Sequence, residues 1–96
     1  MKAILVKPYG QAEVIDLKNE LQEYNDLVDG YIENVYYKDF ILVVNEEGRI
    51  RRLDLNVFDL VGNIVIVRNG CSDYGGLTDS DIEMWLKLIK EELEKC

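Results

Sequence analysis

The chain has 96 residues, of which 48% are hydrophobic, and its formal net charge is −8. This length predicts a single domain over residues 1–96, and no apolar run is long enough for a membrane span. The chain has two cysteines and no histidine, too few ligands for a structural zinc site, and a serine or cysteine nucleophile would lack its usual base. We therefore expect no catalytic residues, no metal and no cofactor, and we expect Cys71 and Cys96 to be free thiols.

The N-terminal third predicts a hairpin followed by a helix. Residues 3–6 are an apolar run that ends in a Pro-Tyr-Gly turn signal, and residues 12–17 can form the second strand. Apolar residues then recur at helical spacing as far as Gly30, which is placed to end the helix. These residues are Leu17, Leu21, Tyr24 and Val28.

The middle of the chain predicts strands joined by a tight turn. Residues 31–37 are rich in strand-forming side chains, and residues 40–44 are wholly apolar, which is typical of a strand buried on both faces. Asn-Glu-Glu-Gly follows at residues 45–48, and we expect Gly48 to adopt a positive φ there. The imperfect alternation of residues 49–53 then predicts a strand near a sheet edge, where arginines discourage further pairing.

The last third predicts a short helical turn at residues 56–60, a buried strand at residues 64–67 and a C-terminal helix. Thr78 is a good N-cap for this helix. The apolar stripe of the helix is expected to contain Ile82, Trp85, Leu86, Ile89, Leu93 and Cys96. The resulting order, ββαβββ-turn-βα, is that of an α+β domain with a mostly antiparallel sheet of about five or six strands and two helices.

The C-terminal loop and helix start contain groups that occur in several kinds of active site. A Gly75-Gly76 loop before a helix is found in phosphate sites, but acidic residues in the first turn would repel phosphate. The same acids, Asp73, Asp79, Asp81 and Glu83, lack the order of calcium ligands in an EF-hand. We therefore interpret this segment as a loop and a helix start without a bound ion.

Acidic residues dominate the segment from Asn19 to Tyr37, which has no lysine or arginine. Their field repels nucleic acid and anionic lipid and attracts basic protein surfaces. Those on the first helix should point to water, so that reversing their charge should leave the fold intact. We expect a protein partner with a basic surface to bind Glu20, Glu23, Asp26, Asp29 and Glu33.

Three arginines, Arg49, Arg51 and Arg52, form the one basic cluster of the chain. They could pair with Glu46 and Glu47 as a solvated strand, which we favour. Alternatively, they could hold an anionic nucleotide or metabolite with the help of tyrosines from the neighbouring strand. The candidate residues for this second hypothesis are Arg49, Arg51, Arg52, Tyr36 and Tyr37.

Met84 and Leu88 lie one turn apart on the C-terminal helix, roughly opposite its apolar stripe. One apolar stripe is enough to dock a helix on a sheet, so this second apolar spot must be either exposed to solvent or covered by something else. Domains of this size often gain stability by self-association. We therefore expect a homodimer with Met84 and Leu88 near the interface.

Several segments together resemble one known family. They are the start MKAILVKP, then VDGYIE, VVNEEG, Asn56 and the closing LTDSDIE. The family is catalogued as domain of unknown function 3846 and is met in phages, plasmids and conjugative elements of Gram-positive gut bacteria. The resemblance implies an accessory role in the cytoplasm of a bacterial host, such as inhibition of a defence or regulatory protein. A structural or assembly role is a further alternative.

Overall fold

The computed structural model of the protein describes residues 1–8, 11–70 and 72–94, and it is an α+β domain with an antiparallel sheet. The strand order is β2-β1-β5-β4-β3, and β6 pairs with β5. Cys71 and Cys96, with the Tyr9-Gly10 part of the predicted turn, lie outside the described residues. The strands are β1 (Lys2–Lys7), β2 (Gln11–Asp16), β3 (Ile32–Tyr37), β4 (Phe40–Asn45), β5 (Ile64–Asn69) and β6 (Tyr74–Gly75). The helices are α1 (Leu21–Val28), η2 (Val57–Asp59, a 3-10 turn) and α2 (Asp79–Glu94).

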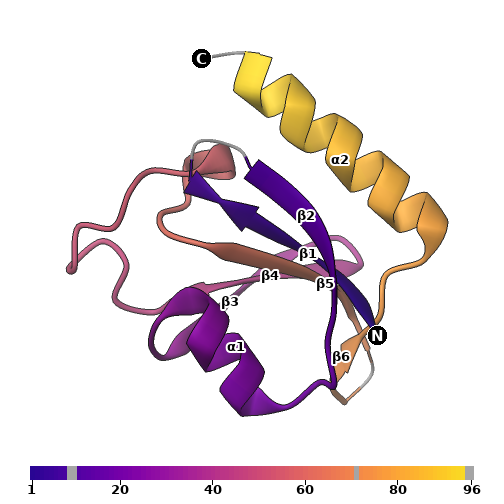
Figure 1. Cartoon of the computed structure of the whole chain (residues 1–96), viewed down its shortest axis with the longest axis horizontal. Coiled ribbons are helices and arrows are strands. Elements are labelled where there is room, and N and C mark those ends of the chain that lie inside the picture. Colours follow the sequence, from indigo (N-terminus) through magenta and orange to yellow (C-terminus); the bar gives the residue numbers. More distant parts are fainter. Residues whose placement is uncertain (9–10, 71, 95–96) are drawn as a thin grey trace.

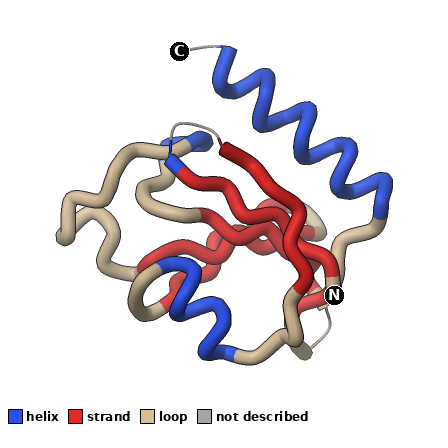
Figure 2. The backbone as a smooth tube through the Cα atoms, viewed as in Figure 1, coloured by secondary structure: helices blue, strands red, loops and turns tan. Residues whose placement is uncertain are grey.

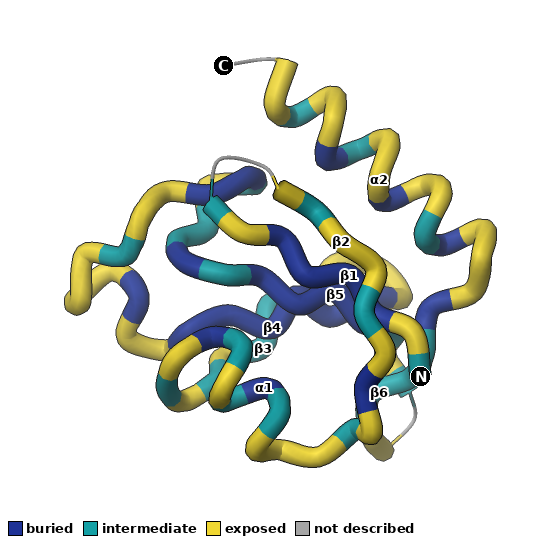
Figure 3. The backbone as a smooth tube through the Cα atoms, in the orientation of Figure 1, coloured by how far each residue is buried: buried dark blue, intermediate teal, exposed yellow. Residues whose placement is uncertain are grey.

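The sheet is a middle layer with one helix on each face (Figure 1). The three central strands β1, β4 and β5 are buried on both faces, as their uninterrupted apolar runs predict (Figure 3). Alternate residues of each strand join one of two cores, since successive side chains of a strand point to opposite faces. Tyr24 and Val28 of α1 close one core, and Trp85 and Ile89 of α2 close the other.

Residues 46–52 are consecutive turns and not the predicted edge strand. Figure 2 shows the connection from β4 to β5 as a long loop interrupted only by η2. The predicted hairpin after β4 is therefore wrong, and β6 is the sixth strand instead. The reason lies in contacts remote in sequence: Arg51 turns back to the end of α1, which draws this segment away from the sheet.

Gly48 does not have the positive φ that was predicted. A glycine is needed here because the neighbouring atoms leave no room for a larger side chain. A Cβ atom at this position would lie 2.6 Å from Cγ2 of Val61 and 3.3 Å from the carbonyl oxygen of Asn45. The backbone N–H of Gly48 donates to that same carbonyl. The turn at Gly48 therefore packs directly against Val61, which belongs to an isolated β-bridge.

Gly48→Val is expected to lower the free energy of unfolding by about 1 kcal/mol or more, because overpacking a buried contact forces its neighbours to shift. Urea unfolding of the variant and the wild type measures this difference. Glu46→Val introduces the same side chain at an exposed position of the same turn and should change stability by less than about 0.5 kcal/mol. Equal stability of all three proteins would contradict the close packing at Gly48.

Helix α1 is shorter than predicted, and two residues of its predicted apolar stripe do not form part of a buried helix face. Leu17 is buried but precedes the helix, and Leu21 is its first residue yet is 63% exposed. The helix ends at Asp29, which adopts the left-handed conformation with φ 59°, just before Gly30. The predicted stop is therefore correct to within one residue.

Helix α2 begins as predicted, with Thr78 as its N-cap. The Thr78 hydroxyl accepts a hydrogen bond from the N–H of Asp81, and the Asp81 carboxylate accepts one from the N–H of Thr78. This reciprocal arrangement satisfies two donors that a helix start leaves free. The apolar stripe is narrower than predicted, since Leu86 and Leu93 are 38% and 36% exposed. Cys96 lies outside the described residues.

Candidate functional site

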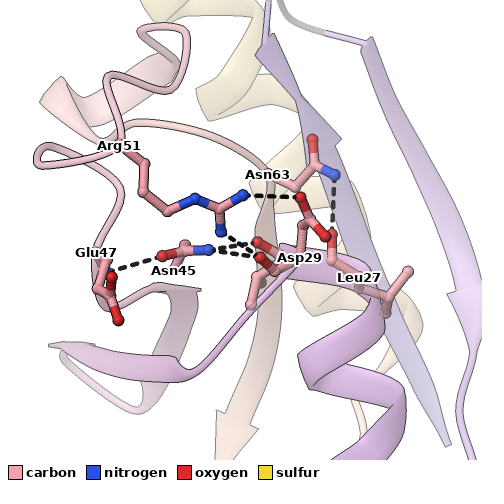
Figure 4. A network of polar contacts seen from close by, with 7 residues as sticks. Leu27, Asp29, Asn45, Glu47, Arg51 and Asn63 are labelled. Atoms are coloured by element: carbon pink, nitrogen blue, oxygen red, sulfur yellow. Dashed lines mark hydrogen bonds and ion pairs between the residues drawn. The ribbon is translucent and has the colours of Figure 1, made fainter.

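The arginine-bearing turn is a structural junction with the C-terminal end of α1 (Figure 4). The buried Asn45 side chain donates to the carbonyls of Val28 and Asp29, and it accepts from the N–H of Glu47. Arg51 donates to the Asp29 carbonyl and pairs with its carboxylate at 3.1 Å. These side chains bind carbonyls that the last turn of a helix leaves without partners. The junction fixes α1 to the loop between β4 and β5.

The predicted anion site is not assembled. Arg49 donates to the carbonyl of Asp59, and Arg52 is exposed with φ 56°. Tyr36 and Tyr37 lie at the opposite end of the β3–β4 hairpin, because Tyr37 pairs with Phe40 while Ile32 pairs with Asn45. A six-residue strand spans about 17 Å. The arginines therefore do not converge with these tyrosines, and Arg49 and Arg51 have partners other than the expected Glu46 and Glu47.

The five acidic residues expected to bind a partner differ in their structural roles. All except Glu23 are exposed, and Glu20 is also the N-cap of α1, in a capping box with Glu23. The Glu23 carboxylate accepts hydrogen bonds from the N–H groups of Glu20 and Lys18, which lower its pKa. Asp29 is the C-cap held by Arg51. The expectation that all α1 acids can be reversed without structural cost is therefore wrong for Glu23.

A mostly apolar cavity of about 420 Å³ lies between α2, the η2 loop and strand β3. We call it the aromatic cavity. Its walls come from β3, β4, the η2 loop and α2, and the last two are far from the strands in the sequence. The lining residues are Val35, Tyr36, Tyr37, Leu42, Phe58, Leu60, Trp85, Leu88 and Glu92.

Trp85 is the centre of the packing around this cavity. Its indole is 2% exposed and meets the rings of Tyr37, Phe40 and Phe58 edge-on, with centroid distances of 5.7, 5.3 and 5.8 Å. Edge-to-face pairs at these distances are favourable beyond the area that they bury. Sequence analysis assigned Trp85 to the helix stripe but missed the cavity beside it, because Phe58 and Val35 reach it only through the tertiary fold.

Arg68 of β5 and Asp81 of α2 form a bidentate ion pair that fixes the register of the helix on the sheet. The guanidinium contacts both carboxylate oxygens, at 3.0 and 2.8 Å, and lies 5.1 Å from the centroid of the Phe40 ring. The Arg68 guanidinium lowers the pKa of the buried Asp81 from 3.8 to about 2. The sequence pattern placed Asp81 in the first turn of the predicted helix and did not indicate Arg68 as its partner.

The Arg68–Asp81 pair predicts a pH dependence of stability. A carboxylate whose pKa is lower in the folded state stabilises the fold above its unfolded pKa, and this contribution is lost as pH falls through the folded pKa. The stability difference between wild type and Asp81→Asn should therefore be constant above about pH 4 and shrink towards pH 2. Urea unfolding at a series of pH values measures it. A difference that does not change over this range would contradict the lowered pKa.

Tyr74 has a structural role. Its ring packs edge-on against Tyr24 at 4.8 Å, and its hydroxyl donates to the side-chain oxygen of Asn34. Burial raises the pKa of both Tyr24 and Tyr74. Both phenols are therefore neutral hydrogen-bond donors within the fold.

Met84 and Leu88 do not form one exposed spot. Met84 is 40% exposed, whereas Leu88 is partly buried and packs against the core that Trp85 and Ile89 close. The expectation that both residues lie opposite the apolar stripe is wrong for Leu88. Self-association through α2 would use Met84, and the homodimer stays a prediction.

Over the residues that the structure describes, no group of three or more potential metal ligands is close enough to hold an ion. Within the same residues, neither helix combines the length and hydropathy needed to cross a bilayer.

A family model with the description "Domain of unknown function (DUF3846)" matches residues 1–90. The chain belongs to the DUF3846 family. The resemblance seen in the sequence motifs is thereby confirmed. Comparison with curated proteins and with solved structures gives no match. Two of the DUF3846 motif residues, Asn45 and Asn56, are buried and bind backbone groups, so they have structural roles in this member.

Proposed function

We propose that this DUF3846 protein is a non-enzymatic binding protein that acts on a host protein as an accessory factor or inhibitor. The observation that carries the proposal is a set of three exposed tyrosines within strand β3 and just before it. Tyr31, Tyr36 and Tyr37 there are 72%, 65% and 45% exposed. Tyrosines with this exposure are common where a protein surface binds another protein.

Strand β3 also offers backbone groups to a partner. It is an edge of the sheet, and its outer side pairs with no strand in the described parts of the chain. Edge strands are usually protected by a proline, a bulge or inward-pointing charges. Within β3 the only charged residue is Glu33. A partner segment could therefore add to this edge as a further strand.

Acidic charge beside this edge favours a basic partner. Asp26 of α1 lines a shallow hollow with Tyr31, and Glu33 lies two residues further along. The whole chain has a net charge of −8. Attraction by such a field accelerates association with a basic surface and weakens as salt screens it. This charge supports a protein partner with a basic surface over nucleic acid or an anionic membrane.

The alternative of an anionic nucleotide or metabolite receives less support. Its proposed ligands Arg49 and Arg51 already donate to backbone carbonyls, and Arg51 is paired with a carboxylate. An incoming anion would have to displace these bonds. The host-inhibitor proposal follows the mobile-element context of the resemblance, and it agrees with the exposed acidic and tyrosine side chains.

The double variant Asp26→Lys/Glu33→Lys is expected to lose at least tenfold in partner binding with little change in stability, since both side chains are exposed. The immobilised protein is used to capture partners from a lysate of the organism that encodes it, and bound proteins are identified and quantified by mass spectrometry. Capture by the wild type should weaken as the salt concentration rises.

The matched control is Glu13→Lys/Glu83→Lys, which changes the net charge equally at exposed positions on β2 and α2. This control should retain the partner. Equal capture by both double variants and the wild type would remove the acidic surface beside β3 from the proposal. Equal loss in both would mean that net charge alone, and not this surface, governs binding.

A further inference from the structure

The aromatic cavity has the dimensions and lining of a small-molecule site. Its volume of about 420 Å³ lies within the range of roughly 300–1,000 Å³ typical of such sites. Eight of its nine lining residues are aliphatic or aromatic, and Glu92 is the charged one. This composition suits a largely apolar ligand and disfavours an anion.

A buried donor at the cavity lacks a partner. Among the side chains of the described residues, Nε1 of Trp85 is the buried nitrogen or oxygen atom without a hydrogen bond. Buried indole N–H groups usually find an acceptor. The rings of Tyr37, Phe40 and Phe58 pack against this indole, and none of them accepts a hydrogen bond from Nε1. The indole therefore has an unmet requirement for an acceptor.

The loop beside the indole has a backbone conformation that is uncommon for its residues. Phe58 and Asp59 both have positive φ, at 60° and 58°. Consecutive left-handed residues other than glycine are strained, and such strain often occurs where a segment holds or covers a ligand. The Phe58 ring lies between the η2 backbone and Trp85 and lines the cavity.

We propose that the aromatic cavity binds a small, neutral, apolar molecule that carries one hydrogen-bond acceptor, and that Nε1 of Trp85 donates to this acceptor. Because Nε1 is fully covered, binding includes a displacement of a ring that packs against the indole, such as that of Phe58. The apolar body of the ligand then fills the space between Val35, Leu60 and Leu88. The lining of this site includes neither Asp26 nor Glu33, but it shares Tyr36 and Tyr37 with the surface proposed for the protein partner.

Two compounds of nearly identical shape test the proposal directly. 2-Acetylnaphthalene carries a carbonyl acceptor, and 2-ethylnaphthalene has a methylene group in its place. Trp85 is the single tryptophan of the chain, so a ¹H–¹⁵N spectrum contains one indole N–H signal. The ketone should shift this signal downfield and bind about tenfold more tightly than the hydrocarbon, because a buried donor left unpaired is costly. No change in the indole signal with either compound overturns the site.

Different variants test the hydrogen bond from Trp85 and the location of the ligand in the cavity. Trp85→Phe removes the donor, so the tenfold preference for the ketone, measured by calorimetry, should disappear. Leu88→Phe fills part of the cavity and should weaken both compounds at least tenfold, whereas Leu86→Phe, on an exposed side of the same helix, should leave binding unchanged. Equal binding of the two compounds to the wild type overturns the role of Nε1. Unchanged binding to Leu88→Phe overturns the location, even if Trp85→Phe does not fold.

Discussion

Asn56→Ala is expected to lower the free energy of unfolding by about 3 kcal/mol. The side-chain nitrogen of Asn56 donates to the carbonyls of Val6 and Gly62 at 3.0 and 2.7 Å. Its oxygen accepts from the N–H of Val57 at 2.8 Å. The residue is 8% exposed, so alanine leaves buried groups without partners, at about 1–3 kcal/mol each before relaxation. One side chain thus joins β1, the η2 turn and the start of β5.

Urea unfolding followed by circular dichroism measures this loss. The control is Asn69→Ala, since Asn69 is exposed and should tolerate alanine within about 0.5 kcal/mol. Asn56→Asp is a sharper comparison, because aspartate keeps the acceptor and loses the two donors. A loss below about 1 kcal/mol for Asn56→Ala would show that the loop does not depend on these bonds.

Trp85→Ala is expected to lower the free energy of unfolding by about 4 kcal/mol, the middle of the range for truncating a large buried aromatic side chain. The indole is 2% exposed and contacts rings from β3, β4 and the η2 loop. Its removal would enlarge the aromatic cavity and separate α2 from this side of the sheet. A loss of this size approaches the whole stability of many small domains.

Thermal unfolding and urea unfolding of Trp85→Ala should both show this effect. Leu86→Ala, one residue further along α2 and 38% exposed, should stay within about 1 kcal/mol of wild type. Similar losses in the two variants would mean that α2 is stabilised by its own helical structure more than by docking through Trp85.

Local sequence patterns were sufficient to predict strands with a continuous buried run and a helix whose N-cap partner is close in sequence. The apolar runs at residues 40–44 and 64–67 correctly predicted buried strands, and the run at residues 3–6 correctly predicted a strand. Thr78 correctly marked the start of α2 because its partner Asp81 is three residues away. In each case the decisive interactions are local or repeat regularly along the chain.

Residues 49–53 could not be predicted correctly because their conformation depends on remote partners. Arg51 is bound by Asp29, which lies 22 positions earlier, and Arg49 by the carbonyl of Asp59. The sequence shows only a cluster of charges there, which suits a solvated strand, a turn or an anion site equally well. The composition of the chain showed the acidic surface, whereas the structural contacts of Glu23 and Asp29 depend on the positions of the two ends of α1.

The position of β1 in the middle of the sheet has a consequence for how the protein folds. This strand pairs with β2, its neighbour in sequence, and with β5, where Ile4 lies opposite Ile66. During synthesis the N-terminal hairpin emerges first, but its inner edge has no partner until most of the chain has left the ribosome. Pairing over such a separation carries a high entropic cost of loop closure and slows folding. The joining of β1 to β5 is therefore a late step, and until then the nascent chain exposes a strongly apolar strand edge.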